Sequence, residues 1–139
     1  MSRKKSGARQ HAVQAIYQWQ MTGQDVREIR GQFLSEQDKS EFDAAYFDRL
    51  VQGVPSHLDE LDKGLGTCLD RSIESVDPVE RAILRLGAFE LIHHLEVPYK
   101  EVIKEAVELA KVFGAEQGHR YVNGVLDRLA QTVRESETR

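Results

Sequence analysis

The segment 97–130 constrains the fold most, because it predicts two consecutive helices with a break between them. Apolar residues recur at three- and four-residue steps through 102–113, while lysine and glutamate fill the opposite side of that helix. Pro98 suits a first helical turn, and Gly114 suits a left-handed position just past the helix end. A second apolar stripe follows at 121–129. The segment therefore predicts a helical hairpin.

The remainder of the chain shows the same helical periodicity. A first helix ends at Gly23, a second begins at Asp25, and the apolar stripe of a later one is broken at 53–55 by glycine and proline. Asp77 precedes a proline and a run at 82–92 that is apolar on nearly every side, which is typical of the central helix of a bundle. No segment alternates with a period of two. The sequence predicts an all-α protein, a compact helical bundle of about six to seven helices in two small subdomains.

Length and composition indicate one ordinary helical domain. The chain has 139 residues, 40% hydrophobic and 30% charged, which is enough for a core without disulfides or metal staples. We expect a flexible basic arm at 1–9, an all-α domain at 10–131 whose halves divide near 53–76, and a polar tail at 132–139. The single cysteine, Cys68, has no partner for an intramolecular disulfide. Since no stretch resembles a signal peptide or a membrane span, we expect a cytoplasmic protein without membrane partners.

Charge is distributed unevenly along the chain. Four basic residues precede the first acidic residue, Asp25, and they are Arg3, Lys4, Lys5 and Arg9. A basic arm on an acidic body favours an anionic polymer, chiefly nucleic acid, although a solvated terminus would look the same. Gln10, Gln14 and Gln18 add a row of amides on the first helix, and amides can pair with base edges. The row is equally compatible with a merely solvated face.

No motif in the sequence indicates catalysis. His93 and His94 are adjacent, so on a helix they point about 100° apart and cannot both ligate one metal without distortion. The glutamates of 101–108 alternate with lysines, which is typical of an ion-paired surface. The sequence has no glycine-rich phosphate-binding loop, no nucleophilic serine in a G-x-S-x-G motif and no dinucleotide-binding glycine motif. We therefore expect no enzymatic activity, no cofactor and no metal.

Six segments in the same order resemble the NusB family of bacterial transcription antitermination proteins. They are AVQAIYQWQ, LRLGAFEL, VPYK, VIKEAVELAK, FGAE and YVNGVLD, and they extend over nearly the whole chain. The resemblance implies an all-helical fold of two small bundles without enzymatic activity. It also implies binding of single-stranded boxA RNA together with NusE, a ribosomal small-subunit protein, and assembly with NusA, NusG and RNA polymerase during ribosomal RNA transcription.

The resemblance assigns RNA contact to the basic arm and to the C-terminal hairpin. The implied residues of the arm are Lys4, Lys5 and Arg9, and those of the hairpin are Lys111, Phe113, Glu116, Gln117, His119, Arg120 and Tyr121. Tyr121 can stack an unpaired base, while Arg120 and Lys111 can neutralise phosphate. The apolar periodicity of 121–129 also allows Tyr121 to be a core residue with its hydroxyl at the surface.

Contact with NusE is implied for Tyr17, Glu74 and Glu80, and Glu80 has a competing role in capping its own helix. Ser6 and Gly7 interrupt the charge of the arm, so we expect tight RNA capture to require NusE. The alternative function is a helical protein-binding adaptor without direct RNA recognition.

Overall fold

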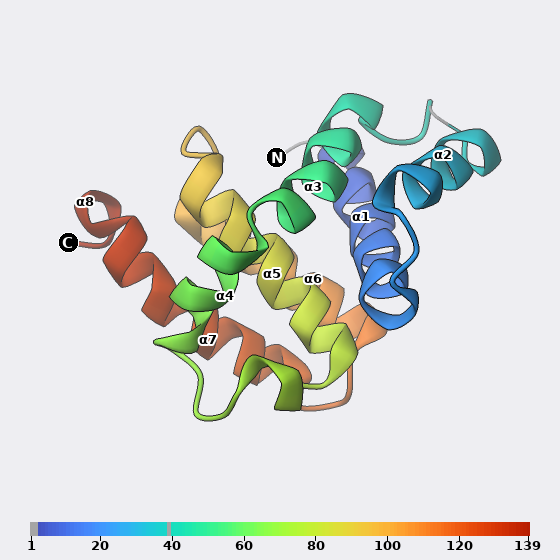
Figure 1. Cartoon of the computed structure of the whole chain (residues 1–139). Helices are drawn as coiled ribbons and strands as arrows, with labels where there is room; N and C mark the ends of the chain where they lie inside the picture. The colour runs from blue at the N-terminus through green and yellow to red at the C-terminus, as the bar shows by residue number, and fades with distance from the viewer. Residues whose placement is uncertain (1–2, 39) are drawn as a thin grey trace. The chain divides into compact units, whose positions relative to one another are not determined.

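The computed structural model describes residues 3–38 and 40–139, and every regular element within them is helical (Figure 1). The elements are α1 (Arg3–Thr22), α2 (Val26–Glu36), α3 (Ala44–Ser56), α4 (Leu58–Gly66), the short 3-10 helix η1 (Ile73–Ser75), α5 (Pro78–His93), α6 (Tyr99–Phe113), α7 (Gly118–Val133) and α8 (Glu135–Thr138). The predicted all-α class is confirmed. The chain divides into two compact units, Met1–Ser56 and His57–Arg139.

The N-terminal unit packs α1 against α2 and α3. Asp25 begins α2, since its carboxylate accepts a hydrogen bond from the backbone N–H of Arg27 at 2.8 Å. Asp43 plays the same role for α3, where it accepts from the N–H of Tyr46 at 2.9 Å. The buried side chains between these helices include Ala12, Ile16, Ile29, Phe47, Leu50 and Val54.

Residues 3–9 differ from the flexible arm expected for the start of the chain, because they form the first turns of α1. Ala8 and Arg9 are buried, and the backbone carbonyl of Lys4 accepts a hydrogen bond from Asp43 N–H at 3.0 Å. The apolar stripe of α1 therefore extends back into the basic segment. Burial of that stripe stabilises a helix where charge alone suggested a solvated chain.

The C-terminal unit is organised around α5, which packs against α4, α6 and α7. Every residue from Ala82 to Leu91 is buried, so the predicted central helix is confirmed. Asp77 caps its start by accepting from the N–H groups of Val79 and Glu80. None of the helices that the structure describes is long and apolar enough to cross a membrane.

The last residues also differ from the polar tail expected at 132–139. Arg134 is only 3% exposed, and its guanidinium donates to the backbone oxygens of Leu91 at 2.7 Å, His94 at 2.9 Å and Glu90 at 3.3 Å. The last carbonyl groups of a helix have no partner within it. Arg134 supplies partners for the end of α5, and α8 follows it directly.

Candidate functional site

The residues expected to contact RNA fall into two sets, one in each unit. In the N-terminal unit, Lys4 and Gln14 are exposed on α1, and the Gln14 amide donates to the backbone oxygen of Gln10 at 3.1 Å. Lys5 is half-buried and Arg9 is 1% exposed. Lys4 and Gln14 are thus available to a ligand, whereas the Arg9 side chain is enclosed by its own unit.

Arg9 belongs to a group of three cations around the buried ring of Tyr46. The Lys5 ammonium lies 5.0 Å from the ring centroid, and the guanidinium carbons of Arg9 and Arg49 each lie 5.3 Å from it. Arg9 also donates to the Tyr46 hydroxyl at 3.4 Å. The expected direct contact between Arg9 and RNA is therefore replaced by an internal one. Arg49, which is exposed, has no sequence pattern that distinguishes it from any other surface arginine.

In the C-terminal unit, the other set surrounds the connection between α6 and α7. Lys111, Glu116, Gln117 and Arg120 are exposed, and His119 is half-buried. Phe113, the last residue of α6, is 36% exposed, and its neighbour Val112 is 60% exposed. Sequence reasoning missed Val112 because it continues the apolar composition of a helix whose other apolar residues are mostly buried. An exposed apolar pair thus adjoins polar and basic side chains.

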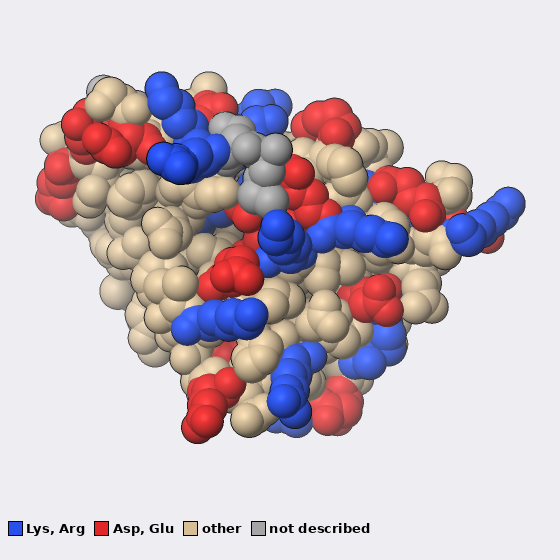
Figure 2. Space-filling model, turned by 180° about the vertical axis from the view of Figure 1, so that it is seen from behind, with Lys and Arg blue, Asp and Glu red and all other residues tan. Residues whose placement is uncertain are grey.

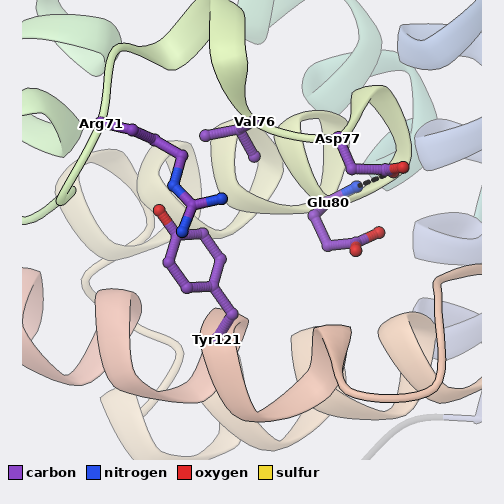
Figure 3. Close-up of a pocket in the computed structure, with 5 residues that line it drawn as sticks. All are labelled: Arg71, Val76, Asp77, Glu80 and Tyr121. Carbon is purple, nitrogen blue, oxygen red and sulfur yellow. Dashed lines mark hydrogen bonds between the residues drawn. The ribbon is translucent and has the colours of Figure 1, made fainter.

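Tyr121 lies half-buried in the first turns of α7, with both its hydroxyl and its ring engaged. The hydroxyl donates to Asp70 Oδ1 at 3.2 Å. The Arg71 guanidinium carbon lies 5.0 Å from the ring centroid, and Figure 3 draws these two side chains beside each other. The Arg71 Nε–H donates to Asp70 at 2.8 Å and is the main reason why the pKa of Asp70 falls to about 2. Burial raises the pKa of Tyr121, so its hydroxyl stays protonated. The ion pair of Asp70 and Arg71 therefore holds Tyr121 near the surface.

A hollow of about 210 Å³ adjoins this ring. It is lined by Arg71, Val76, Asp77, Glu80 and Tyr121, which come from the loop after α4, the start of α5 and the start of α7 (Figure 3). Its volume is below the roughly 300–1,000 Å³ of sites that enclose a drug-sized ligand. The hollow has room for ordered water or for part of a planar group. It is too small to enclose a cofactor.

Glu80 lines this hollow and is only 6% exposed. Burial, followed by the neighbouring Asp77 carboxylate, raises the pKa of Glu80 to about 7. Its Oε2 atom has no hydrogen-bond partner among the residues that the structure describes. An added Cβ would lie 3.0 Å from Oε2 at Gly114 and 2.6 Å from Oε1 at Gly118. The connection between α6 and α7 therefore leaves room for a carboxylate that a larger residue would displace.

This contact corrects the expectation for Gly114, whose backbone is extended (φ −91°, ψ −179°) and not left-handed. The position requires space, because an added Cβ would lie 2.8 Å from the backbone oxygen of Ala110 and 3.0 Å from Glu80 Oε2. Among the residues expected to contact a partner, Tyr17 is 39% exposed and Glu74 is exposed in η1. The Glu80 carboxylate faces the interior, where a partner could meet it only through the hollow.

Acidic and basic side chains are interspersed over the face of the molecule drawn in Figure 2, and no large area of one sign is visible there. Recognition of an anion on this face would therefore depend on individual side chains. A broad positive field is not available to it.

Comparison with known proteins gives one consistent result. A model of the NusB family matches residues 6–131. The transcription antitermination protein NusB of Nitrosococcus oceani is 57% identical over 139 residues, which are 100% of this chain and 93% of that protein. The NusB protein of Pseudomonas savastanoi is 51% identical over 138 residues, covering 99% and 84% of the two chains.

Solved structures agree with the sequence relatives. A chain in the crystal structure of antitermination factors NusB and NusE in complex with dsRNA superimposes with a TM-score of 0.84 at 30% identity, covering 94% of this chain and 98% of that one. NusB of T. maritima superimposes with a TM-score of 0.81 at 26% identity, covering 95% and 94%.

Proposed function

The chain belongs to the NusB family of transcription antitermination proteins, and from this premise we propose that it binds boxA RNA together with NusE during ribosomal RNA transcription. As a family member it is an antitermination factor and not an enzyme. The solved complex of NusB, NusE and dsRNA supports the pairing of RNA with this partner. NusA, NusG and RNA polymerase complete the proposed assembly, which places the protein in the bacterial cytoplasm, where transcription occurs.

The observation that carries the proposal is the position of Tyr121. Proteins recognise unpaired RNA by stacking bases on aromatic rings or on guanidinium planes, with nearby cations for phosphate. Tyr121 has its hydroxyl fixed by Asp70 and a ring that is already stacked by a cation, Arg71. A base can displace the Arg71 guanidinium from the ring, or it can stack on the outer face of that guanidinium. Both routes use a platform that is rigid before RNA arrives.

The surroundings of Tyr121 suit the same ligand. Arg120 and Lys111 are exposed for phosphate contact, although Lys111 also lies 3.7 Å from the Glu108 carboxylate. Phe113 offers a second exposed aromatic ring at the end of α6. Glu116, Gln117 and His119 contribute hydrogen-bonding groups along the connection to α7.

In the N-terminal unit, we assign phosphate contact to Lys4, Lys5 and Arg49, with Gln14 as a hydrogen-bonding neighbour. Arg9 has an indirect role, since it holds the Tyr46 ring that Lys5 and Arg49 also contact. For NusE we assign Tyr17 and Glu74, the two exposed candidates, as direct contacts. Glu80 would act through the hollow.

Fluorescence anisotropy of labelled boxA RNA and a scrambled RNA, with and without NusE and at two salt concentrations, tests the proposal. Tyr121→Ala removes the ring and should weaken boxA binding by about 5- to 150-fold, since stacking contributes roughly 1–3 kcal/mol per base. Tyr121→Phe keeps the ring and should retain most of the affinity. Tyr99→Ala, at the opposite end of α6, is the matched aromatic control. Wild-type affinity in Tyr121→Ala, with its circular dichroism unchanged, would refute the assignment.

One observation favours the second candidate, a helical protein-binding adaptor without direct RNA recognition. Arg9 is enclosed, so one of the four basic residues at the start of the chain is not at the surface for RNA contact. Capture of NusE without any preference for boxA, in both the presence and the absence of the partner, would favour the adaptor.

A further inference from the structure

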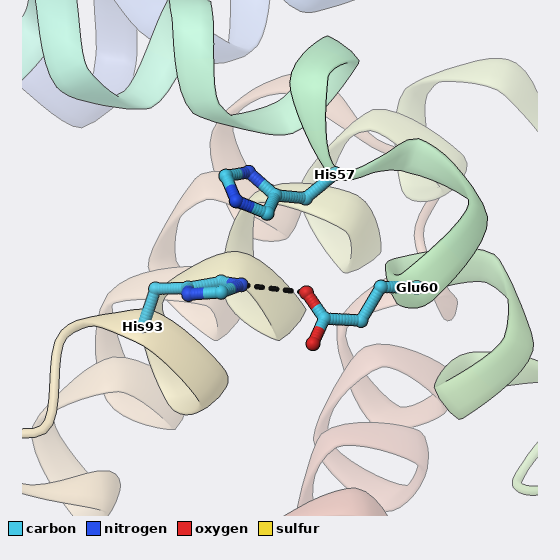
Figure 4. Close-up of side chains that lie close together, drawn as sticks. All are labelled: His57, Glu60 and His93. Carbon is cyan, nitrogen blue, oxygen red and sulfur yellow. Dashed lines mark hydrogen bonds and ion pairs between the residues drawn. The ribbon is translucent and has the colours of Figure 1, made fainter.

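The start of α4 and the end of α5 bring two imidazoles and a carboxylate together in the C-terminal unit. His57 immediately precedes α4, Glu60 lies in its first turn, and His93 is the last residue of α5 (Figure 4). The His93 Nε2 atom lies 2.6 Å from Glu60 Oε1, and the two imidazole centroids are 4.3 Å apart. One ligand atom from each residue lies within 4.8 Å of the other two. The proposed RNA and NusE contacts use none of these residues.

We propose that His57, Glu60 and His93 bind a first-row transition-metal dication of the zinc class. Imidazole nitrogen and carboxylate oxygen are ligands that Zn²⁺ accepts at about 2.0–2.2 Å, which places two ligand atoms of a tetrahedral ion about 3.3 Å apart. The observed separations of 2.6 Å and up to 4.8 Å lie on either side of this value. Small rotations of partly exposed side chains would bring all three to bonding distance.

The surroundings hold the two imidazoles in place. The Phe89 ring packs against both, with centroid distances of 5.6 Å to His57 and 5.1 Å to His93. His93 also lies at the C-terminus of α5, where the helix dipole favours a cation. The helix dipole at the N-terminus of α4 disfavours a cation, and the negative charge of the Glu60 carboxylate offsets this effect.

The same residues explain why sequence spacing alone missed the site. The adjacent pair His93 and His94 is unsuitable, and His94 is in fact buried with its ring packed on Phe89. The group found here combines His57, just before α4, and Glu60, in the first turn of α4, with His93, which lies 33 positions after Glu60. Only the packing of α4 on α5 places them together. A bound ion would therefore link these two helices.

Isothermal titration of the full-length protein with Zn²⁺ alone tests the inference, supported by the visible absorption of Co²⁺, which reports ligand geometry. We expect one ion per chain. His93→Ala and Glu60→Gln should each weaken binding at least about tenfold, because even the loss of an outer hydrogen-bond partner costs about 10- to 100-fold at metal sites. Zn²⁺ should also raise the Tm of the wild type but not of His93→Ala.

His119→Ala, which removes a half-buried histidine of α7, is the matched control and should bind Zn²⁺ as the wild type does. Absence of binding at micromolar Zn²⁺ would overturn the inference. So would equal affinity in the wild type and His93→Ala, provided that circular dichroism shows both to be folded. Because RNA affinity is measured separately, a failure here is distinguishable from a failure of the proposed function.

Discussion

Replacing Glu80 by glutamine should remove the loss of stability that this carboxyl causes as the pH rises from about 5 to 8. The pKa of Glu80 rises from 4.5 to about 7 in the folded protein, chiefly through burial. Between these values the folded state binds a proton that the unfolded state has released. The stabilisation from this proton is complete below pH 4.5 and is lost as the pH rises through 7.

The size of the effect follows from the shift. Each pKa unit corresponds to about 1.4 kcal/mol, so the wild type should lose up to about 3 kcal/mol of unfolding free energy across this range. Glutamine keeps the shape of the side chain and can still accept the hydrogen bond from the Ala115 backbone that the Glu80 carboxylate receives. It carries no charge at any pH. The variant should therefore equal the wild type near pH 5 and exceed it above pH 7.

Urea denaturation followed by far-UV circular dichroism at several pH values measures this directly. Glu116→Gln, an exposed carboxylate on the connection between α6 and α7, is the matched control and should follow the wild-type curve. Parallel curves for the wild type and Glu80→Gln would refute the assignment of the titration to Glu80. A constant loss in Glu80→Gln at every pH would show that packing, and not charge, dominates at this position.

Two further substitutions test the packing of the C-terminal unit by urea denaturation. Arg134→Ala removes three hydrogen bonds to backbone oxygens at the end of α5, two of which, on Glu90 and His94, keep a backbone N–H donor, and it should cost about 1–3 kcal/mol. Arg134→Lys should recover part of this, and equal stability of the two variants would contradict the hydrogen-bond argument. Gly87→Ala would place a Cβ 2.7 Å from Leu126 Cδ1, and the overpacking cost of about 1–3 kcal/mol should exceed the ~1 kcal/mol gain in helix propensity. A higher Tm in Gly87→Ala would show that Leu126 moves aside freely.

Local sequence signals predicted a helix well where the sequence contains a residue that caps its start. Asp25 and Asp77 cap the helices that follow them, because an N-cap needs only a side chain and the next turn. The burial of Arg134 within the segment 132–139 could not be predicted in this way. The hydrogen bonds that hold Arg134 reach residues at least 40 positions away, in the last turn of α5 and at the residue that follows it, and no local pattern records them.

The burial of Arg9 did leave a signal in the sequence. Val13 and Ile16 follow it at four and seven residues, so Arg9 lies on the apolar face of α1 and not beside Gln10 and Gln14. The basic composition of residues 3–9 obscured this periodicity. A buried aromatic hydroxyl from α3 then satisfies the guanidinium, and that partner is visible only in the fold.

At the candidate site, the resemblance identified Tyr121, but the residues that fix it lie in a loop without periodicity. Asp70 and Arg71 are adjacent in sequence and 50 or more positions from Tyr121. Gly124, inside α7, has no closely packed neighbour, since an added Cβ would meet only the Arg128 guanidinium at 3.6 Å, an ordinary contact.

The buried Glu80 carboxylate links the two surfaces that the proposed function requires. It belongs to the first turn of α5, six residues after Glu74, and it contacts the connection that carries Glu116 and Gln117. A partner that places a cation at the hollow would favour the ionised carboxylate and lower the pKa of Glu80. Binding of such a partner would then release a proton, and by linkage it would be tighter at higher pH.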